Sequence, residues 1–342
     1  MAQNELHTTA KALVAAGKGI LAADESGGTI KKRFDAIGVE STEANRQAYR
    51  DLLFTTPGSE DYISGVILFD ETIRQTALDG TPFPQLLASK GIIPGIKVDQ
   101  GAKPLALAAG ETVTEGLDGL RQRLEEYRGL GARFAKWRTT YSITDTLPSD
   151  YCTWANAHTL ARYAALCQEA GIVPIVEPEV LMDGTHTLAR ASVVTGRVLQ
   201  AVFTELHDQR IDLRGMLLKP NMTLSGYEAS DRAGVDAVAD ATLDCFYRHV
   251  PAAVPGIVFL SGGQSEEEST AHLNAMNAKG PHPWELSFSY GRALQAAALK
   301  AWSGKPDQVE AGRRAYYHRA KMNSAARTGV YAPAMEREAV PA

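Results

Sequence analysis

The chain has 342 residues, of which 44% are hydrophobic and 22% are charged, and its formal net charge is −5. This balance is typical of a globular protein, and no basic run is dense enough to indicate a nucleic-acid partner. No stretch approaches the roughly 20 apolar residues that span a membrane, and residues 1–20 lack the apolar core of a signal peptide. The three cysteines form no C-x-x-C pair, so we expect reduced, buried thiols in a cytoplasmic protein without a membrane partner.

Eight short apolar runs follow one another along the chain and are separated by longer amphipathic segments. The runs are too short for helices, and most are rich in Val, Ile, Leu and Phe, as buried parallel strands are. They lie at residues 19–23, 63–69, 92–98, 133–137, 172–176, 215–218, 256–260 and 285–288. Eight strands that alternate with helices predict a closed barrel or an open doubly wound sheet, and their even distribution favours the barrel.

The segments between the runs have the periodicity of amphipathic helices. Residues 117–127, 154–164 and 194–206 place apolar side chains three or four positions apart, and Ser265 with Glu268 forms a capping box. The whole chain, residues 1–342, is therefore predicted to be one α/β domain, a (β/α)8 TIM barrel with an N-terminal helix. Residues 328–342 are predicted to form an irregular, mobile tail.

Charged and hydroxyl side chains follow the predicted strands, at the point where each strand ends. The carboxyl ends of all eight strands of such a barrel open on one face, where the active sites of this fold lie. Charges at the ends of buried strands are costly unless they bind one another or a ligand, so we expect them to surround one pocket. They are Asp24, Asp70, Glu71, Lys97, Lys136, Arg138, Glu177, Glu179, Lys219, Ser261, Ser289 and Arg292.

The ends of strands four to six predict a reactive amine. Lys136 and Lys219 lie on alternate strands that contribute to the same layer, with Glu177 on the strand between them. Two nearby ammonium groups lower each other's pKa, and a neutral amine attacks a ketone to form an imine. This arrangement predicts a nucleophilic lysine beside an acid–base carboxylate.

Each of these residues also has a purely structural interpretation. A single lysine at a strand end is usually a solvated cap, and Glu177 and Glu179 of the E-P-E motif could form structural ion pairs. Asp24 could cap the helix that follows it, although Ser26 is the better capping candidate. Three lysines on alternating strand ends with carboxylates nearby make the structural interpretation the weaker one.

The last two strand ends predict a phosphate site. A turn without Cβ atoms presents several backbone amides to one anion, and the N-terminus of the following helix attracts phosphate. Barrels often bind phosphate at strands seven and eight. The candidate residues are Ser261, Gly262, Gly263, Ser289, Gly291 and Arg292.

A second anion site is predicted across the mouth of the barrel. Ser26 and Thr29, after the first strand, flank two glycines and could act together with Lys97 after the third strand. Two phosphate sites on either side of an amine and a carboxylate imply a bisphosphorylated carbonyl substrate.

Metal and nucleotide chemistry find no support in the sequence. None of the eight histidines has H-x-x-x-H spacing or lies directly at a predicted strand end. The chain also lacks a dinucleotide fingerprint after its first strand, a phosphate-binding P-loop and a G-x-S-x-G motif. We therefore expect no metal and no other cofactor.

Seven stretches of the chain together carry a family resemblance, which covers about residues 5–330. They are G-I-L-A-A-D-E-S (19–26), G-I-K-V-D-Q-G (95–101), F-A-K-W-R (134–138), I-V-E-P-E (175–179), L-L-K-P-N-M (217–222), F-L-S-G-G-Q-S-E-E (259–267) and S-F-S-Y-G-R-A-L-Q (287–295). On these motifs the chain resembles the class I fructose-bisphosphate aldolases. The resemblance implies a metal-independent lyase of glycolysis and gluconeogenesis that cleaves fructose 1,6-bisphosphate to dihydroxyacetone phosphate and glyceraldehyde 3-phosphate. It also implies a homo-oligomer, commonly a tetramer.

The resemblance assigns roles to the candidate catalytic residues. Lys219 matches the lysine that forms the imine with the C2 ketone, and Glu177 matches the glutamate that shuttles protons while the imine forms. Lys136 and Glu179 support that network. Asp24 matches the aspartate that handles the proton of the C4 hydroxyl during carbon–carbon cleavage.

The resemblance also divides the anion-binding residues between two phosphates. Ser261, Gly262 and Arg292 match the residues that hold the 1-phosphate. Ser26 and Lys97 match the 6-phosphate side, where Thr29 stands in for a common serine, and Arg138 also faces the pocket. Family members with a well-known tail end in a tyrosine that assists enamine protonation. This chain ends in E-R-E-A-V-P-A and its last tyrosine is Tyr331, so either Tyr331 moves in or another group supplies the proton.

Two other functions remain open on the sequence. Another phosphosugar barrel, such as a transaldolase or an aldolase that prefers fructose 1-phosphate, would differ in its turnover of the two fructose phosphates. A sugar-phosphate-binding or scaffold protein without catalysis is a different class of function. The presence of Asp24, Lys136, Glu177 and Lys219 argues against it, because pure binding needs no reactive amine.

Overall fold

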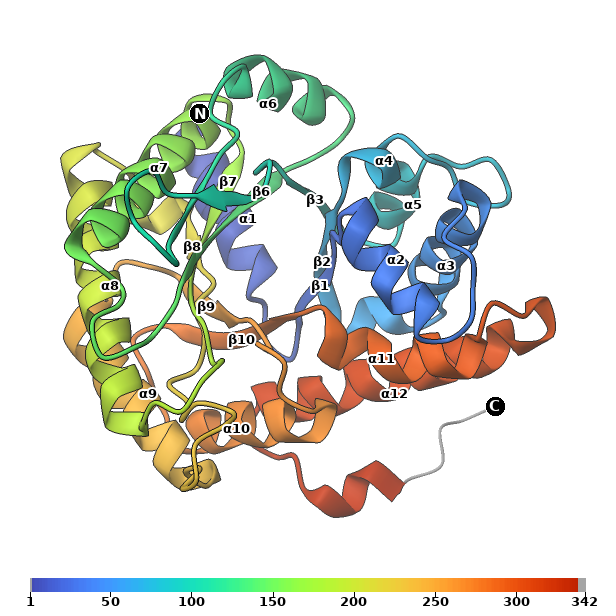
Figure 1. Cartoon of the computed structure of the whole chain (residues 1–342). Coiled ribbons are helices and arrows are strands. Elements are labelled where there is room, and N and C mark those ends of the chain that lie inside the picture. Colours follow the sequence, from blue (N-terminus) through green and yellow to red (C-terminus); the bar gives the residue numbers. More distant parts are fainter. Residues whose placement is uncertain (1, 338–342) are drawn as a thin grey trace.

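The computed structural model describes residues 2–337 and contains the predicted closed barrel (Figure 1). Each of the eight predicted runs forms one parallel barrel strand, which confirms the TIM-barrel prediction. Around the ring, the strand order is β1-β10-β9-β8-β7-β6-β3-β2. The strands are β1 (Gly19–Ala23), β2 (Ile63–Leu68), β3 (Ile93–Lys97), β6 (Phe134–Tyr141), β7 (Val173–Val180), β8 (Leu217–Leu218), β9 (Gly256–Phe259) and β10 (Glu285–Tyr290).

Apart from the N-terminal helix, the helices surround the barrel, with α7 (Asp150–Glu169) and α8 (Leu188–Asp208) on one flank, α2 (Gly27–Asp35) and α3 (Glu43–Thr55) on the opposite flank and α12 (Val309–Arg327) below them in Figure 1. None of the helices within residues 2–337 is both long enough and apolar enough to cross a membrane. The α-helices are α2 (Gly27–Asp35), α3 (Glu43–Thr55), α4 (Asp70–Ile73), α5 (Phe83–Ser89), α6 (Leu120–Gly129), α7 (Asp150–Glu169), α8 (Leu188–Asp208), α9 (Val235–His249), α10 (Glu266–Ala278), α11 (Arg292–Trp302) and α12 (Val309–Arg327). Short 3-10 helices are η1 (Ser59–Asp61), η2 (Leu213–Gly215), η3 (Pro306–Gln308) and η4 (Pro333–Arg337).

The predicted N-terminal helix, α1 (Ala2–Leu13), closes one end of the barrel. Its buried side chains, among them Leu13, share a hydrophobic cluster with inward-facing strand residues such as Phe134. Phe134 fills the space that glycines leave open, because a Cβ atom on Gly95 would collide with its ring. This end is a packed core, so a ligand has access to the barrel from the opposite end.

Along β7 and β8, the side chains that face the barrel interior change from apolar to charged toward the carboxyl-terminal end. Successive side chains of a strand point to opposite faces, so every second residue faces the barrel interior. In β7, Val173 and Ile175 belong to the interior cluster, and the same face continues to Glu177. In β8, the buried Leu217 is followed on the same face by Lys219. The catalytic candidates thus occupy the carboxyl-terminal layer of the barrel.

Strands β6 and β7 are longer than predicted. Both have eight residues and pair along their full length, with Arg138 opposite Glu177. The apolar runs at 133–137 and 172–176 stop near the first charged residues, whereas the backbone ladder continues past them. A small antiparallel hairpin of β4 (Ala102–Pro104) and β5 (Thr112–Thr114) follows β3 and was not predicted.

The predicted capping box is half formed. Ser265 precedes α10, and its Oγ accepts a hydrogen bond from the backbone N–H of Glu268 at 3.0 Å. The carboxylate of Glu268 accepts a hydrogen bond from Arg232 at 2.8 Å. The hydroxyl therefore fixes the start of α10, while Glu268 ties that helix to the segment before α9.

The chain after α12 is attached to the barrel up to residue 337. Tyr331 is buried, its backbone N–H donates to Asn274 Oδ1 at 2.9 Å, and its hydroxyl donates to Glu336 Oε1 at 3.0 Å. Glu336 also accepts hydrogen bonds from Arg319 and His318. Residues 338–342 lie outside the described residues, and the mobility of the tail stays a prediction.

Buried His272 on α10 should make the fold sensitive to acid. It is 2% exposed, and its Nδ1 donates to Gln264 Oε1 at 2.5 Å. Burial lowers the pKa of His272 from 6.5 to about 4. Between these two values the unfolded chain binds more protons, so the free energy of unfolding should fall by up to about 3 kcal/mol as the pH drops from 6.5 to 4.

Urea unfolding at pH 7 and pH 4.5 tests this expectation. His272→Asn keeps an amide donor for Gln264 but cannot titrate, so it should lose less stability than the unmodified protein between these pH values. An unchanged pH dependence in His272→Asn would exclude this histidine as the source.

Candidate active site

A cavity of about 960 Å³ opens at the carboxyl-terminal ends of the barrel strands. Among the strand-end residues, Glu71 was wrongly expected here, because it pairs with Arg46 and lines a separate, smaller cavity. Every residue predicted to act in catalysis or in substrate binding lines this one cavity, although the residues come from loops and strands spread over most of the chain. They are Asp24, Ser26, Thr29, Lys97, Lys136, Arg138, Glu177, Glu179, Lys219, Ser261, Gly262, Gly263, Ser289, Gly291 and Arg292. Strand-end position therefore placed these residues together correctly, while their individual roles stay predictions.

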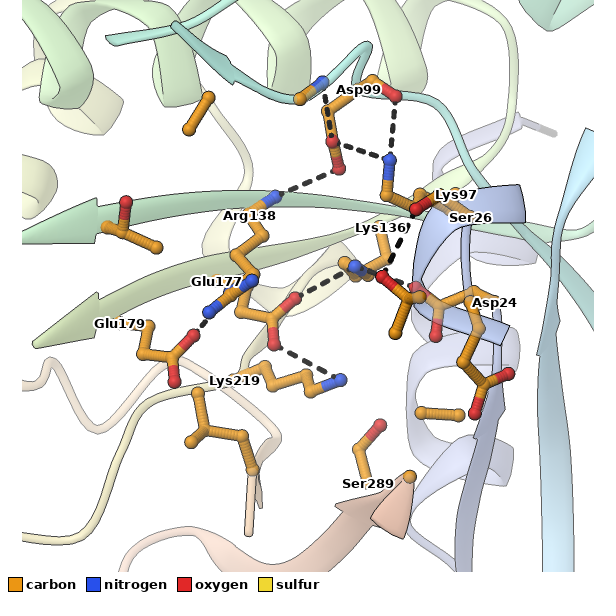
Figure 2. A pocket seen from close by; sticks show the side chains of 18 of the residues that line it. Asp24, Ser26, Lys97, Asp99, Lys136, Arg138, Glu177, Glu179, Lys219 and Ser289 are labelled. Atoms are coloured by element: carbon orange, nitrogen blue, oxygen red, sulfur yellow. Dashed lines mark hydrogen bonds and ion pairs between the residues drawn. The ribbon is translucent and has the colours of Figure 1, made fainter. Parts of the chain in front are cut away.

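A chain of charges joins three barrel strands and the end of β1 at the centre of the cavity (Figure 2). The Lys136 amine lies 2.7 Å from Asp24 Oδ2 and 3.1 Å from Glu177 Oε2. The other oxygen of Glu177, Oε1, lies 3.2 Å from the Lys219 amine. Glu177 thus stands between the two lysines, as predicted, with all three side chains about 95% buried.

The expectation that Lys136 has a lowered pKa is wrong. Burial by itself would lower the pKa of this amine, but Asp24, Glu177 and Asp99 surround it and together raise the pKa above its ordinary value. Two direct carboxylate neighbours outweigh the repulsion that was expected from the second lysine. Lys136 is therefore a permanent cation in this cavity.

Asp24 carries the negative charge that pairs with the Lys136 cation. Its burial would raise the pKa, but Lys136, Lys219 and Lys97 more than compensate and hold the pKa well below its ordinary value. The side chain stays a carboxylate at every pH at which the protein is expected to work. Ser26, and not Asp24, occupies the N-cap position of α2, so the carboxylate of Asp24 is paired with Lys136 in the cavity and is not a helix cap.

Glu179 is paired differently from Glu177. Its carboxylate accepts a hydrogen bond from Nε of Arg138, on the neighbouring strand (Figure 2). Burial raises the pKa of Glu179, and the nearby Glu177 adds to the rise, whereas Arg138 opposes it. For Glu179, the structural ion pair that the sequence left open is present.

The predicted 6-phosphate side consists of the loop after β1 and the end of β3. Ser26 occupies the N-cap position of α2, but its side chain caps no backbone amide and instead lies 3.2 Å from the hydroxyl of Thr29. The Lys97 amine lies 2.6 Å from Asp99 Oδ1. Two hydroxyls, an ammonium group and a helix N-terminus therefore border this part of the cavity, as anion binding requires.

The predicted 1-phosphate side consists of the ends of β9 and β10. Gly262 and Gly263 have φ angles of +55° and +90°, in the left-handed region that favours glycine. Helix α11 begins at Arg292. The hydroxyl of Ser289 is buried and has no hydrogen-bond partner among the residues that the structure describes. This part of the cavity offers backbone amides, a guanidinium group and a free hydroxyl.

Several residues that line the cavity were not predicted, among them Asp99, Arg33, Arg123 and Tyr227. Asp99 follows Lys97 within the same motif and could have been recognised there, because a buried carboxylate next to a lysine indicates an ion pair. Arg33 lies on α2, Arg123 on α6 and Tyr227 in the segment after β8, away from any strand end. Their approach to the cavity is a property of the fold, which a rule about strand ends does not detect.

Arg33 reaches the cavity through a buried ion-pair network. Glu25 accepts hydrogen bonds from Arg33 and, at 2.5 Å, from Arg50, and Gln295 also donates to it at 2.9 Å. Burial would raise the pKa of Glu25, but Arg50 and Arg33 hold it below its ordinary value.

Within residues 2–337, no three His, Cys, Asp or Glu side chains come together in a way that could hold a metal ion. All three cysteines are free and buried.

Comparison with known proteins gives a consistent result over nearly the whole chain. The sequence model of the family described as fructose-bisphosphate aldolase class-I matches residues 5–341. A probable fructose-bisphosphate aldolase class 1 of Xylella fastidiosa is 57% identical over 330 residues, which are 96% of this chain and 99% of the relative. The cytosolic fructose-bisphosphate aldolase 4 of Arabidopsis thaliana is 52% identical over 96% of this chain and 84% of its own length.

A solved structure agrees with these sequence matches. It contains fructose-bisphosphate aldolase from Plasmodium falciparum in a complex with TRAP and a small-molecule inhibitor, and it superimposes with a TM-score of 0.96. The sequence identity is 51%, and the match covers 97% of this chain and 96% of the other.

Proposed function

The chain belongs to the class I fructose-bisphosphate aldolase family and is a lyase, and on that premise we propose that it cleaves fructose 1,6-bisphosphate reversibly through an imine on Lys219. The observation that carries this mechanism is the buried Glu177 carboxylate, whose two oxygens lie beside the Lys219 and Lys136 amines. A purely binding site would not need an amine and an acid–base group in contact and buried within the cavity.

Imine formation begins when the Lys219 nitrogen attacks the C2 ketone and the ketone oxygen becomes a hydroxyl group. Loss of that hydroxyl as water needs a proton donor within reach of both nitrogen and oxygen. Glu177 is 3.2 Å from the Lys219 amine, so it can take the proton that the amine gives up and pass it to the departing oxygen. The cation of Lys136 stabilises the carboxylate form of Glu177 before it takes this proton and after it has given the proton up.

Carbon–carbon cleavage uses the protonated imine as an electron sink. When the C3–C4 bond breaks, its electron pair moves toward C2 and the iminium nitrogen, which gives an enamine. The C4 hydroxyl loses its proton and becomes the aldehyde of glyceraldehyde 3-phosphate. Asp24 is the carboxylate positioned for that proton, because Lys136 holds it ionised at 2.7 Å. Protonation of the enamine and hydrolysis then release dihydroxyacetone phosphate and restore Lys219.

The two anion-binding sides of the cavity would hold the substrate with its ketone at Lys219. Gly262, Gly263 and Arg292 lie on the side of β9 and β10, and Ser26 and Lys97 lie on the side of β1 and β3. The central charge chain lines the same cavity as both groups. Binding energy from both phosphates thus fixes the orientation of the reacting carbons.

Borohydride trapping tests the proposed imine directly. Incubation with dihydroxyacetone phosphate and borohydride should attach a reduced three-carbon phosphate adduct to Lys219, located by peptide mass spectrometry. Borohydride without the ketone should leave the same peptide unmodified. An adduct on another lysine, or no adduct in an active preparation, would contradict the mechanism.

The other assignments made from the sequence remain proposals. Turnover of fructose 1,6-bisphosphate and of fructose 1-phosphate, compared side by side, separates the proposed substrate from the alternative one. The cytosolic name of a relative supports a cytoplasmic location, and the family supports a homo-oligomer and a place in glycolysis and gluconeogenesis.

A further inference from the structure

Two carbonyl oxygens of the turn at Gly262 and Gly263, those of Ser261 and Gly262, accept hydrogen bonds from the protein. Ser261 O accepts hydrogen bonds from the backbone N–H and from the side-chain amide of Gln264, both at 3.0 Å. Gly262 O accepts a hydrogen bond from the hydroxyl of Tyr227 at 2.8 Å. Neither oxygen is therefore left free to face an anion, which it would repel.

The N–H groups of the same peptides are free. Within the part of the chain that the structure describes, neither Gly262 N–H nor Gly263 N–H donates a hydrogen bond to the protein. The C=O and N–H of one trans peptide point in opposite directions. Fixing Ser261 O and Gly262 O consequently fixes the directions of the two following amides, and consecutive free amides in a tight turn form an anion-binding concavity.

Tyr227 is itself held rigidly. Its backbone N–H donates to Met182 O at 2.8 Å, which joins the segments after β7 and β8. The Arg232 guanidinium lies 5.0 Å from the centre of its ring and also binds Glu268 on α10. Burial raises the pKa of Tyr227 to about 12, so the phenol keeps the proton that it donates to Gly262 at neutral pH.

Tyr227 also borders the space that the amides face. A Cβ atom on Gly263 would lie 3.4 Å from the Tyr227 ring and 3.5 Å from Arg292 Nη2, so these three residues converge on one spot of the cavity wall. We propose that Tyr227 is a positioning residue for substrate binding: its hydroxyl orients the Gly262 peptide so that the turn presents N–H groups to the phosphate nearest the ketone. This inference rests on the proposed function for the identity of the ligand.

Tyr227→Phe removes the hydroxyl and leaves the ring with its cation–π contact in place. The KM for fructose 1,6-bisphosphate and the KM for fructose 1-phosphate should both rise about fivefold, the effect of one net hydrogen bond, while kcat changes less than twofold. A rise for the bisphosphate alone, or a loss of kcat at constant KM, would overturn the proposal, because Tyr227 would then act at another place.

Tyr247→Phe is the matched control, since this exposed hydroxyl binds His282 on the outer surface of the barrel. It should leave both KM values unchanged, and an equal rise in the control would also overturn the proposal. Titration of both variants with inorganic phosphate, followed by calorimetry, provides a measurement that needs no imine chemistry. Tyr227→Phe should weaken phosphate binding about fivefold.

The two measurements separate failure of this inference from failure of the proposed function. If the unmodified protein shows no aldol cleavage but Tyr227→Phe weakens phosphate binding, the proposed function fails and the role of Tyr227 is supported. If cleavage is present and Tyr227→Phe changes neither KM nor phosphate affinity, the role of Tyr227 is excluded.

Discussion

Replacement of Lys219 by methionine should reduce kcat for fructose 1,6-bisphosphate by about 10⁴-fold or more, the scale seen when a covalent catalyst is removed. Methionine has a similar volume and no amine, so neither an imine nor an electron sink can form. Because Lys219 is 3% exposed and methionine is apolar, the barrel should fold without an unpaired charge at this position. Steady-state cleavage, with the aldehyde product coupled to a reporter reaction, measures the effect.

Two controls make the Lys219→Met result specific. The variant should keep its affinity for fructose 1,6-bisphosphate within about threefold in calorimetry, because the phosphate-binding residues are unchanged. Lys31→Met, on the exposed face of α2, should retain full activity. Cleavage by Lys219→Met above about 1% of the unmodified rate would mean that another group carries the reaction. Binding without turnover in the unmodified protein would favour the scaffold function.

Replacement of Lys136 by methionine should lower kcat by about 10²- to 10³-fold, within the range for loss of acid–base assistance. The variant also has a diagnostic pH dependence. Lys136 is the nearest of the cations that hold the pKa of buried Asp24 below its ordinary value, and the effect of burial acts in the opposite direction. Without Lys136, Asp24 should become protonated at a higher pH, so the acidic limb of the kcat profile should move toward neutral pH.

Measurement of kcat from pH 4.5 to 9 distinguishes this electrostatic role from simple damage. Unfolding or misplacement of Lys219 would lower kcat equally at all pH values. Loss of the Lys136 cation would instead shift the acidic limb of the kcat profile to higher pH. Lys97→Met supplies a graded comparison, because Lys97 is a weaker contributor to the shift of Asp24 and should move the limb less. A lowered kcat with an unmoved acidic limb would exclude the proposed charge coupling.

Much of the barrel was predictable because its signals are local. The run that ends at Ala23 and the run that begins at Gly256 lie where the structure has β1 and β9, since a buried strand requires consecutive apolar residues. The pairing between strands was harder to predict from the sequence. The extension of β6 as far as Tyr141 depends on its partner β7, and no apolar run marks it.

Membership of the site was predictable for residues at strand ends and not for others. Asp24, Lys136 and Lys219 could be grouped because the barrel brings all carboxyl ends of its strands to one face. Arg33 and Tyr227 lie away from strand ends, and the packing of α2 and of the segment after β8 brings them to the cavity. The burial of Tyr331 and its bond to Glu336 also depend on the tail folding back, which the sequence left open.

The amino-acid sequence by itself determined the fold class, the family and the strand-end side chains at the mouth of the barrel. These follow from periodicity and from motifs a few residues long, in which neighbours in sequence are neighbours in space. Only the tertiary structure decided which charge pairs with which, and hence that the pKa of Lys136 is raised instead of lowered. The physical reason is that an ion-pair energy depends on distances of a few ångströms between residues far apart in the chain, and sequence spacing does not give those distances.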